Sequence, residues 1–462
     1  MRKELSLLPH QERVLSKIFN NDIKKHILAM DTGTGKTIVG LTILRLLEGE
    51  RKRCLIVCPP ILIQNAWLGD NDEFDLFGMN IIPLLKNNIQ AEIFKKNGIY
   101  ICSYDMVRIY EQHFKKYSWD IIILDESHKI CNRSSKTSRV IVGGWNKTNS
   151  RMESGLSCDR LYMLTGSVIP NKEEQIYQQL KACGYSYSWT KFKQQYFISP
   201  VPMHPYIIEF NEAMRDEFNK LVARYTTVCK FDETDLKNIE KVFNVIKFSP
   251  SEEQLKIQSE IKRGIIKSLS AKAITMDYRL TAIMKSRQVA RGFITDNLSE
   301  KYYQISRTPY KMFEDFITTR ADNEPYIVWY CFEYELKMLQ KHTGKIKNWA
   351  LNGGLTKTVQ DKIIDEFKKS DNGVLFIQYA VGKNGLTLTN CKNMVFFSLE
   401  DNAESWQQSQ ARIHRIGQKS ESVNYYVFIC RNTIDEAIYQ SLINKGNMIE
   451  DLKNWLEGND ND

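Results

Sequence analysis

Several features that define other classes of protein are missing from this sequence of 462 residues. No apolar run approaches the roughly 20 residues that a helix needs to span a bilayer, so we expect no membrane segment. The charged start at residues 1–5 is followed by neither an apolar h-region nor a small-residue cleavage site, so we expect no signal peptide. Low-complexity tracts and short-period repeats are absent as well, which argues against a disordered or repetitive chain.

The ten cysteines and seven histidines form no metal-binding pattern. The sequence holds no CxxC pair, and its closest cysteines, Cys54 and Cys58, are four positions apart within an apolar segment. This spacing argues against a zinc ribbon and favours reduced thiols in a cytoplasmic setting.

What is present describes a soluble globular protein with a mild basic excess. Apolar residues make up 42% of the chain and aromatic residues 11%, and the length allows two or three domains with cores of their own. The net charge of +9 suits a polyanionic partner, but proteins that bind none carry such a charge equally often. The charge therefore does not decide the function, and the motifs must.

Short unbroken apolar runs alternate with helical patterns in two parts of the chain. Runs of this length indicate parallel strands that are covered on both faces. The pattern therefore predicts an α/β fold with two doubly wound parallel-sheet domains in tandem. The runs are residues 27–30, 54–58, 99–102, 121–124, 160–164, 326–330, 374–377, 394–397 and 425–428.

A helical and polar stretch separates the two α/β patterns, from about residue 249 to 299. Within it, residues 256–291 carry nine basic side chains against two acidic ones. A solvated helix face explains this charge as well as a nucleic-acid contact surface does. We expect a first domain at residues 1–235, a linker with a small helical insertion at 236–300, and a second domain with C-terminal helices at 301–462.

A glycine-rich turn follows the first apolar run. The motif GTGKT at residues 33–37 stands between that strand and a helix expected at 37–47, which is the setting of a phosphate-binding loop. We expect Lys36, on a solvent-facing loop, to reach the β- and γ-phosphates, and Thr37 to bind Mg²⁺. The first glycine of the full GxxxxGK[ST] pattern is missing, because Met30 stands there. Since a bare GKT occurs by chance in many proteins, the flanking strand and helix carry the prediction.

An acidic pair ends the fourth apolar run. Asp125 and Glu126 stand at the carboxyl end of a buried strand, where ligands bind in open α/β sheets. We expect Asp125 to bind Mg²⁺, and Glu126 to position and deprotonate the attacking water. Taken alone, the pair also fits the acidic N-terminus of a following helix. A phosphate loop in the same sheet makes the nucleotide site the better interpretation.

Two arginines lie near the end of the second α/β pattern. Arg412 and Arg415 are three positions apart, so on a helix they share one face, and Gln408 precedes them. An arginine supplied by a second domain stabilises the charge on a transferring phosphoryl group. The alternative is an ordinary basic surface helix.

Taken in order, these motifs resemble those of superfamily 2 helicases and, within them, the Snf2 family. The sequence DESH at 125–128 resembles the DEAH box, LTGSVIPN at 164–171 resembles motif III, and HRIGQ at 414–418 is close to diagnostic of Snf2 proteins. The family segments run from residue 8 to 418, which is nearly the whole chain. The others are LPHQ at 8–11, LIVCP at 55–59, Ser103 with Tyr104, and GLTL at 385–388.

This resemblance implies two RecA-like domains, ATP and Mg²⁺ as cofactors, and a DNA-dependent ATPase. Two departures, Asp31-Thr32 for the usual Glu-Met and Ser167 for threonine, remove no catalytic group. Trp406, which precedes the two arginines, either packs in the protein beside them or stacks on a nucleic-acid base. Packing is the commoner fate of a tryptophan. The implied nucleotide contacts are Gln11 at adenine, Thr32, Gly33, Thr34, Gly35, Lys36, Thr37, Gly385 and Gln408, and the implied coupling residues are Thr165, Gly166 and Ser167.

The resemblance also implies the partner. The DESH box, residues 136–138 and the Gly-Leu-Thr of motif V look closest to the fork-remodelling, annealing-helicase branch, so we expect forked or branched DNA. Without bromo-, chromo-, RING or nuclease modules, the sequence resembles Snf2 proteins of bacteriophages and bacteria. We therefore expect it in the cytoplasm of a bacterial or phage-infected cell, associated with the nucleoid.

Three other functions stay open. One is an RNA helicase, and a second is a duplex translocase that displaces proteins without separating strands. The third is a non-catalytic nucleic-acid-binding scaffold. The scaffold is disfavoured because Lys36, Asp125, Glu126 and Arg415 are all present.

Overall fold

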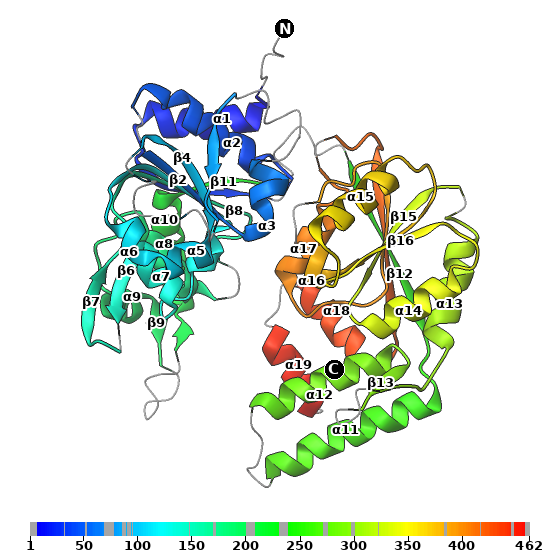
Figure 1. Ribbon diagram of the computed structural model, residues 1–462. Coiled ribbons are helices and arrows are strands. Elements are labelled where there is room, and N and C mark those ends of the chain that lie inside the picture. The colour runs from blue at the N-terminus through cyan, green and yellow to red at the C-terminus, as the bar shows by residue number, and fades with distance from the viewer. Residues whose placement is uncertain are drawn as a thin grey trace. The chain divides into compact units, whose positions relative to one another are not determined.

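A parallel sheet forms the centre of each of two units in the computed structural model of this chain, Met1–Lys237 and Asn238–Asp462 (Figure 1). The structure describes residues 7–31, 33–50, 53–68, 78–85, 89, 94, 96–146, 148–169, 172–199, 208–230, 239–270, 276–296, 301–321, 323–382, 386–415, 417–444 and 448–457.

The sheet of the first unit has seven parallel strands in the order β11-β1-β8-β5-β2-β4-β3. All five apolar runs that we expected in this part of the chain are strands, and they occupy its centre. The strands are β1 (Lys25–Met30), β2 (Arg53–Cys58), β3 (Ile81–Pro83), β4 (Gly98–Ser103), β5 (Trp119–Asp125), β8 (Cys158–Thr165) and β11 (Thr226–Cys229).

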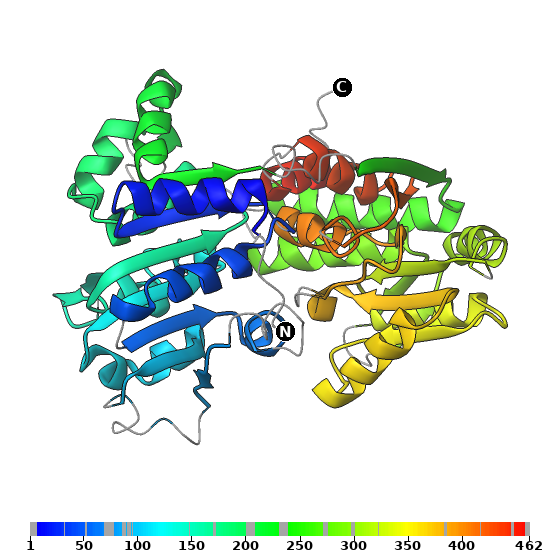
Figure 2. The ribbon, with the colours of Figure 1, turned by 90° about the horizontal axis from the view of Figure 1, so that it is seen from above.

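Helices cover both faces of this sheet (Figure 2). Because successive strand residues point to opposite faces, Leu28 belongs to the apolar cluster that includes residues of α1 and α2, whereas Ile27 belongs to the cluster that includes residues of α5, α6 and α7. The unbroken apolar runs are thus explained by burial on both sides. The helices are α1 (Pro9–Asn20), α2 (Lys36–Leu46), α5 (Tyr104–Ile109), α6 (Glu111–Lys115) and α7 (Lys136–Val142).

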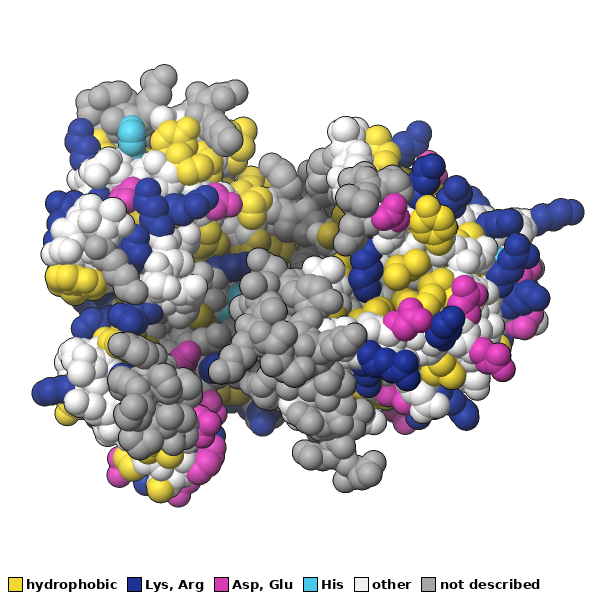
Figure 3. All heavy atoms as spheres, turned by 90° about the horizontal axis from the view of Figure 1, so that it is seen from below, with side chains coloured by type: hydrophobic (Ala, Val, Ile, Leu, Met, Phe, Trp, Pro, Cys, Tyr) yellow, Lys and Arg dark blue, Asp and Glu magenta, His cyan; other side chains and the backbone are white. Residues whose placement is uncertain are grey.

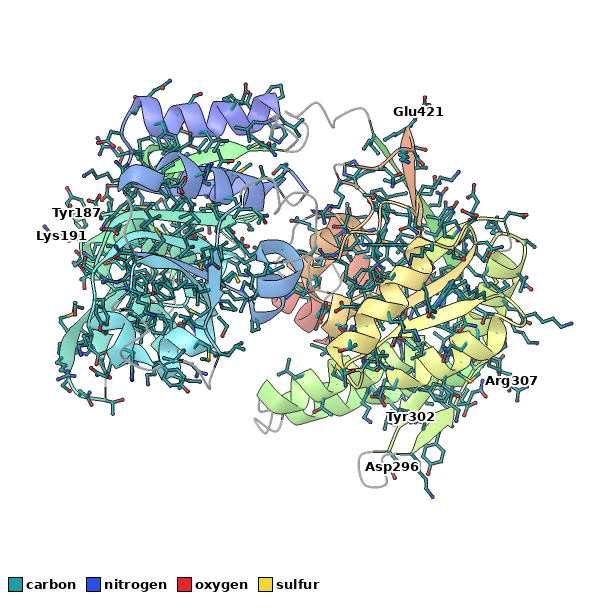
Figure 4. The ribbon with its side chains drawn as sticks, turned by 45° about the horizontal axis from the view of Figure 1, so that its top comes forward. Tyr187, Lys191, Asp296, Tyr302, Arg307 and Glu421 are labelled. Atoms are coloured by element: carbon teal, nitrogen blue, oxygen red, sulfur yellow. The ribbon has the colours of Figure 1, made fainter. Side chains whose placement is uncertain are left out.

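A smaller aromatic cluster, which includes Phe192 and Phe218, holds the last helices of the first unit together. At its surface, Lys191 Nζ lies 5.4 Å from the centroid of the Tyr187 ring (Figure 4). The remaining elements of this unit are α8 (Tyr177–Ala182), α9 (Trp189–Tyr196), α10 (Arg215–Tyr225), α3 (Pro60–Leu62), β6 (Gly143–Asn146), β7 (Arg151–Ser154), β9 (Phe197–Ile198), β10 (Glu209–Phe210) and the short turns η1 (Glu48–Glu50), η2 (Ile63–Trp67), η4 (Ser127–Ile130), η5 (Glu173–Ile176) and η6 (Glu212–Met214).

The sheet of the second unit has six parallel strands in the order β12-β19-β18-β15-β17-β16. The four expected apolar runs are its central strands. The strands are β12 (Glu240–Phe248), β15 (Pro325–Tyr330), β16 (Asn348–Leu351), β17 (Gly373–Gln378), β18 (Asn393–Phe396) and β19 (Ser422–Cys430); the helices are α11 (Glu252–Ser270), α12 (Met276–Ala290), α13 (Thr308–Thr318), α14 (Glu333–His342), α15 (Lys357–Lys368), α16 (Tyr379–Gly382), α17 (Ala403–Gln410), α18 (Ile434–Asn444) and α19 (Met448–Glu457).

The segment expected as a linker and insertion, residues 236–300, differs from that expectation. Its described part belongs to the second unit, where β12 pairs with β19 along nine residues. Two of its basic residues anchor α12 to the core: Arg287 Nη2 donates to Leu399 O at 2.7 Å, and Arg291 Nη2 lies 2.5 Å from Asp435 Oδ2. These two arginines are buried, so neither forms a solvated face or a nucleic-acid surface.

A two-stranded hairpin, β13 (Phe293–Thr295) and β14 (Tyr302–Gln304), follows α12. Asp296 N–H donates to Lys301 O at 2.9 Å, and the Tyr302 ring stacks on Tyr334 with 5.3 Å between centroids (Figure 4). On the face shown in Figure 3, lysine and arginine side chains stand among acidic and apolar ones. No helix among the described residues is long and apolar enough to cross a bilayer.

Candidate functional site

The glycine-rich turn lies between β1 and α2, as its sequence predicted. Gly33 has φ 93° and Gly35 has φ 85°, in the left-handed region that favours glycine, so the tight turn requires both residues. Helix α2 begins at Lys36, and the N-terminus of a helix favours a bound phosphate. Thr32 lies outside the described residues, and Thr37 is half-buried in the first turn of α2.

Lys36 is less exposed than we expected, because it lies in the helix and turns toward the sheet. Its Nζ donates to Met30 O at 3.2 Å and lies 3.9 Å from Glu126 Oε1. The side chains of Lys36 and Glu126 are only 10% and 14% exposed. The structure thus brings the predicted phosphate-binding lysine and the predicted base together.

Gln11 links α1 to the phosphate loop. Its Nε2 donates to Thr34 O at 3.1 Å, and its Oε1 accepts from Leu8 N–H at 3.1 Å. His10 Nε2 lies 2.9 Å from the same Thr34 oxygen. A Cβ at Gly35 would lie 2.3 Å from Gln11 Nε2, so this approach also requires glycine. Gln11 therefore supports the loop, and its contact with adenine stays a prediction.

Asp125 is buried at the end of β5 and held from three directions. Its Oδ2 accepts from Trp67 Nε1 at 2.9 Å, and its Oδ1 accepts from Glu126 N–H at 3.0 Å. The hydroxyl of Tyr104 donates to Asp125 O at 2.8 Å. Sequence reasoning missed Trp67, which lies 58 positions before Asp125, although a tryptophan shortly after the second strand was the available signal.

Burial raises the pKa of Asp125 to about 6, and the neighbouring Glu126 carboxylate adds to the rise. The Trp67 hydrogen bond and Lys36 act in the opposite direction. A nearby cation stabilises the ionised form of a buried carboxyl group such as that of Asp125. The Asp125 carboxylate and the Thr37 hydroxyl are oxygen ligands of the kind that Mg²⁺ prefers. The residues present thus fit a magnesium ion.

Glu126 adopts an unusual backbone conformation, with φ 51° and ψ 53°. A non-glycine residue keeps this left-handed conformation only where its surroundings hold it, and such residues cluster at functional sites. His128 Nδ1 lies 3.4 Å from Glu126 Oε2, the carboxylate oxygen that Lys36 does not approach. Glu126 is therefore held between two basic side chains.

The loop after β8 folds back on Thr165. The Thr165 hydroxyl donates to Ser167 O at 2.7 Å and accepts from Ser167 N–H at 3.1 Å. Thr165 is fully buried, and Gly166 follows it in the loop. Pro170 and Asn171, at the end of this motif, lie outside the described residues.

Arg412 and Arg415 lie in a turn, so our prediction that they share a helical face is wrong. Helix α17 ends at Gln410, and Arg412 O accepts from Leu388 N–H at 3.0 Å instead of continuing the helix. Arg412 is buried, whereas Arg415 is half-buried and donates from Nη1 to Leu386 O at 3.4 Å.

The other residues of this segment hold the second unit together. His414 Nε2 lies 3.0 Å from Ile239 O, and Gln418 Nε2 donates to Cys391 O at 3.0 Å. Trp406 is buried with its ring 4.3 Å from that of Phe396, so it packs in the core. Gln408 is half-buried on α17. Gly385 lies outside the described residues, so its predicted contact has no structural description here.

The ten cysteines are thiols and form no disulfide, and no three His, Cys, Asp or Glu residues gather as a metal site in the described parts of the chain. The structure brings together Gln11, the phosphate loop, Lys36 and the acidic pair within the first unit. Arg412 and Arg415 belong to the second unit, so their role at the nucleotide stays a prediction.

Two family models match the chain. Residues 10–292 match the SNF2-related domain, and residues 309–417 match the helicase conserved C-terminal domain. The first match alone covers more than half of the chain.

Several curated proteins are similar along almost the whole chain. The uncharacterized ATP-dependent helicase YqhH of Bacillus subtilis is 23% identical, covering 97% of this chain and 80% of that protein. The putative ATP-dependent helicase/translocase YwqA of the same organism is 23% identical over 93% of this chain. The DNA annealing helicase and endonuclease ZRANB3 of Bos taurus is 20% identical over 99% of it. The chain spans 47% of YwqA and 42% of ZRANB3.

Among solved structures, the Sulfolobus solfataricus SWI2/SNF2 ATPase core in complex with dsDNA is similar to this chain. The two are 18% identical, the match covers 97% of this chain and 95% of that one, and the TM-score is 0.43.

Proposed function

This chain belongs to the SNF2-related family of helicases, and from that premise we propose that it is an ATP-driven motor that moves on DNA. The match confirms the predicted relation to Snf2 proteins and the expectation of an enzyme of the ATP-dependent helicase kind. The α/β fold with two parallel sheets is confirmed as well. The substrate, the roles of the site residues and the mode of movement are our proposals.

The observation that carries the proposal is the buried acidic pair beside Lys36. Lys36 offsets the charge of the β- and γ-phosphates of ATP, and Glu126 accepts a proton from the water that attacks the γ-phosphate. The products are ADP and phosphate, and the proton leaves through Glu126. Thr37 and Asp125 would hold Mg²⁺, which when bound would neutralise phosphate charge.

The second unit supplies the remaining positive charge. Arg415 reaches the γ-phosphate when the two units close on ATP, and Arg412 supports it. Gln408 and Gly385 are further nucleotide contacts from this unit, and Gln11 reads adenine from the first. Closure of the two units on ATP and the hydrolysis that follows change the distance between two surfaces that bind DNA phosphates. This change moves the protein along a DNA strand.

Forked or branched DNA is the proposed substrate, in replication, recombination or repair. The DESH box supports this, as does the similarity to a protein named as a DNA annealing helicase. Because the protein contacts DNA mainly through the backbone phosphates, DNA binding is independent of base sequence and sensitive to salt. The second candidate is a translocase that displaces proteins without separating strands, and YwqA is named a putative helicase/translocase. We place the motor at the nucleoid of a bacterial or phage-infected cell.

A substrate panel tests the proposal. ATP hydrolysis is measured with Mg²⁺ and no nucleic acid, then with single-stranded RNA, blunt duplex DNA, a fork and a four-way junction. We expect DNA to raise the rate by at least about tenfold, equivalent to 1.4 kcal/mol, with forks or junctions the best activators. Strand displacement on the fork distinguishes a helicase from a translocase. An ATPase rate that no nucleic acid changes contradicts the motor, and a higher rate with RNA contradicts the DNA assignment.

A further inference from the structure

Gln179 has its whole side chain inside the first unit, and both ends of its carboxamide are bonded. It lies on α8 and is 0% exposed. Its Oε1 accepts from Ser127 Oγ at 2.8 Å, and its Nε2 donates to Val168 O at 2.8 Å. The same Nε2 lies 3.3 Å from Cys131 Sγ. One buried side chain therefore joins the residue after Glu126 to the loop after Thr165.

The first of these bonds restrains the acidic pair. Glu126 keeps a left-handed backbone, φ 51°, that a glutamate adopts only when neighbouring groups hold it. On its N-terminal side, Asp125 Oδ1 accepts the Glu126 N–H. On its C-terminal side, Ser127 is fully buried and bonded to Gln179. The orientation of Glu126 thus depends on where Gln179 holds Ser127.

The second bond restrains the loop that follows β8. Thr165 fixes the near side of this loop through its two bonds with Ser167. The Val168 carbonyl, on the far side, is the acceptor for Gln179. If this loop moves, Nε2 either follows it or loses a buried hydrogen bond, and an unsatisfied buried donor is costly.

We propose that Gln179 is a positioning residue that makes the orientation of Glu126 depend on the loop at residues 166–169, and so couples DNA binding to ATP hydrolysis. The proposal rests on the proposed function, because it needs a DNA-stimulated ATPase. Gln179 contacts neither substrate in this role. It transmits a change at Val168 to Ser127, and from there to the adjacent Glu126.

The neighbouring glutamine provides a matched control. Gln178 lies on the same helix and is 3% exposed, but its Nε2 donates to Ser138 Oγ at 2.7 Å, on α7. Gln178→Leu and Gln179→Leu therefore each remove one buried carboxamide from the same helix. Only the second change removes the connection between Ser127 and Val168.

The experiment measures kcat and the KM for ATP with and without saturating fork DNA, together with the thermal unfolding midpoint. We expect Gln179→Leu to lower the DNA-stimulated kcat about tenfold while the KM for ATP changes less than about twofold. We also expect the ratio of the DNA-stimulated kcat to the kcat without DNA to fall in Gln179→Leu. Gln178→Leu is expected to lower the unfolding midpoint by a similar amount and to keep the wild-type ratio.

A second variant protects the test against misfolding. Ser127→Ala removes one hydroxyl from the same bridge, so we expect it to lower the ratio in the same direction, by about threefold to fivefold. The double variant with Gln179→Leu is expected to be no worse than Gln179→Leu alone, because both changes break one connection.

The proposal is overturned if Gln179→Leu and Ser127→Ala keep the wild-type ratio, or if Gln178→Leu lowers the ratio as much as Gln179→Leu does. Wild-type protein that DNA does not stimulate contradicts the proposed function and this proposal together. Stimulated wild-type protein with an unchanged ratio in both variants contradicts this proposal alone.

Discussion

The two units present their polar groups in different ways. In the first unit, side chains from distant parts of the sequence hold the site: Trp67 bonds Asp125, and Gln11 bonds the phosphate loop. In the second unit, the turn that carries the arginines is held by backbone and side-chain bonds together, since Leu388 N–H bonds Arg412 O and His414 Nε2 lies 3.0 Å from Ile239 O. The first unit thus has a preorganised acidic site, and the second offers cations on a turn. In the proposed mechanism, the first unit supplies the base and the second supplies cations that stabilise the γ-phosphate.

The largest effect is expected from the first unit. Replacing Lys36 with alanine removes the cation 3.9 Å from Glu126 and the proposed phosphate contact. We expect DNA-stimulated hydrolysis to fall by at least about 10³-fold. Far-UV circular dichroism checks that the fold is kept. Near wild-type turnover in this variant would mean that the nucleotide site is misplaced.

Glu126→Gln separates binding from chemistry within the same unit. The carboxamide keeps the shape of the side chain but cannot accept the proton, so we expect kcat to fall by about 10²–10⁴ while ATP stays bound. Equilibrium binding of labelled ATP and single-turnover hydrolysis measure the two effects. An equal loss of nucleotide binding would make Glu126 structural.

Tyr104→Phe tests how strongly the surrounding side chains hold the acidic pair. It removes the hydroxyl that donates to Asp125 O at 2.8 Å. We expect a roughly fivefold lower kcat, which corresponds to one hydrogen bond of about 1 kcal/mol. The control is Tyr100→Phe, on β4 just before α5, whose hydroxyl donates to Lys96 O instead. If Tyr104→Phe and Tyr100→Phe have the same kcat, the hydrogen bond from Tyr104 does not position Asp125.

The smallest effect concerns stability in the first unit rather than catalysis. Burial lowers the pKa of His26 to about 4, with a smaller contribution from Lys17, and His26 Nε2 lies 2.9 Å from Thr227 Oγ1. Below about pH 6.5 the unfolded chain takes up a proton at this histidine, but the folded chain does not until about pH 4. The free energy of unfolding should therefore fall by about 1 kcal/mol between pH 7.5 and 5.5.

Urea unfolding of wild-type protein and of His26→Gln at both pH values measures this contribution. We expect a smaller pH dependence in the variant, by about 1 kcal/mol. Equal pH dependence in the two proteins would show that His26 does not titrate differently on unfolding.

The fold was predictable at its centre and not at its edges. All nine apolar runs coincide with central strands, because burial on both faces leaves a continuous apolar signature. The four strands that we missed in the two large sheets, β3, β11, β12 and β16, are the edge strands. Along β12 most side chains are at least partly exposed, and the alternation with lysines at 241 and 247 hides the strand.

The candidate site shows the same limit. Motif spacing placed Lys36, Asp125 and Glu126 in one site, because the carboxyl ends of neighbouring parallel strands meet at one edge. It missed Trp67 and Gln179, since the Trp67–Asp125 and Ser127–Gln179 bonds each span more than 50 positions and depend on tertiary packing. The helical spacing of Arg412 and Arg415 was misleading, because α17 ends at Gln410 and both arginines follow it in a turn.

The account depends most on the proposal that one ATP molecule uses groups from both units. The direct test is single-turnover ATP hydrolysis by wild-type protein and by Arg415→Ala on the best DNA substrate, with ATP and DNA binding measured in parallel. We predict a loss of hydrolysis of about 10³-fold or more, while ATP binding weakens far less and DNA binding persists. Normal hydrolysis by Arg415→Ala would contradict the two-unit mechanism and make this arginine part of an ordinary surface.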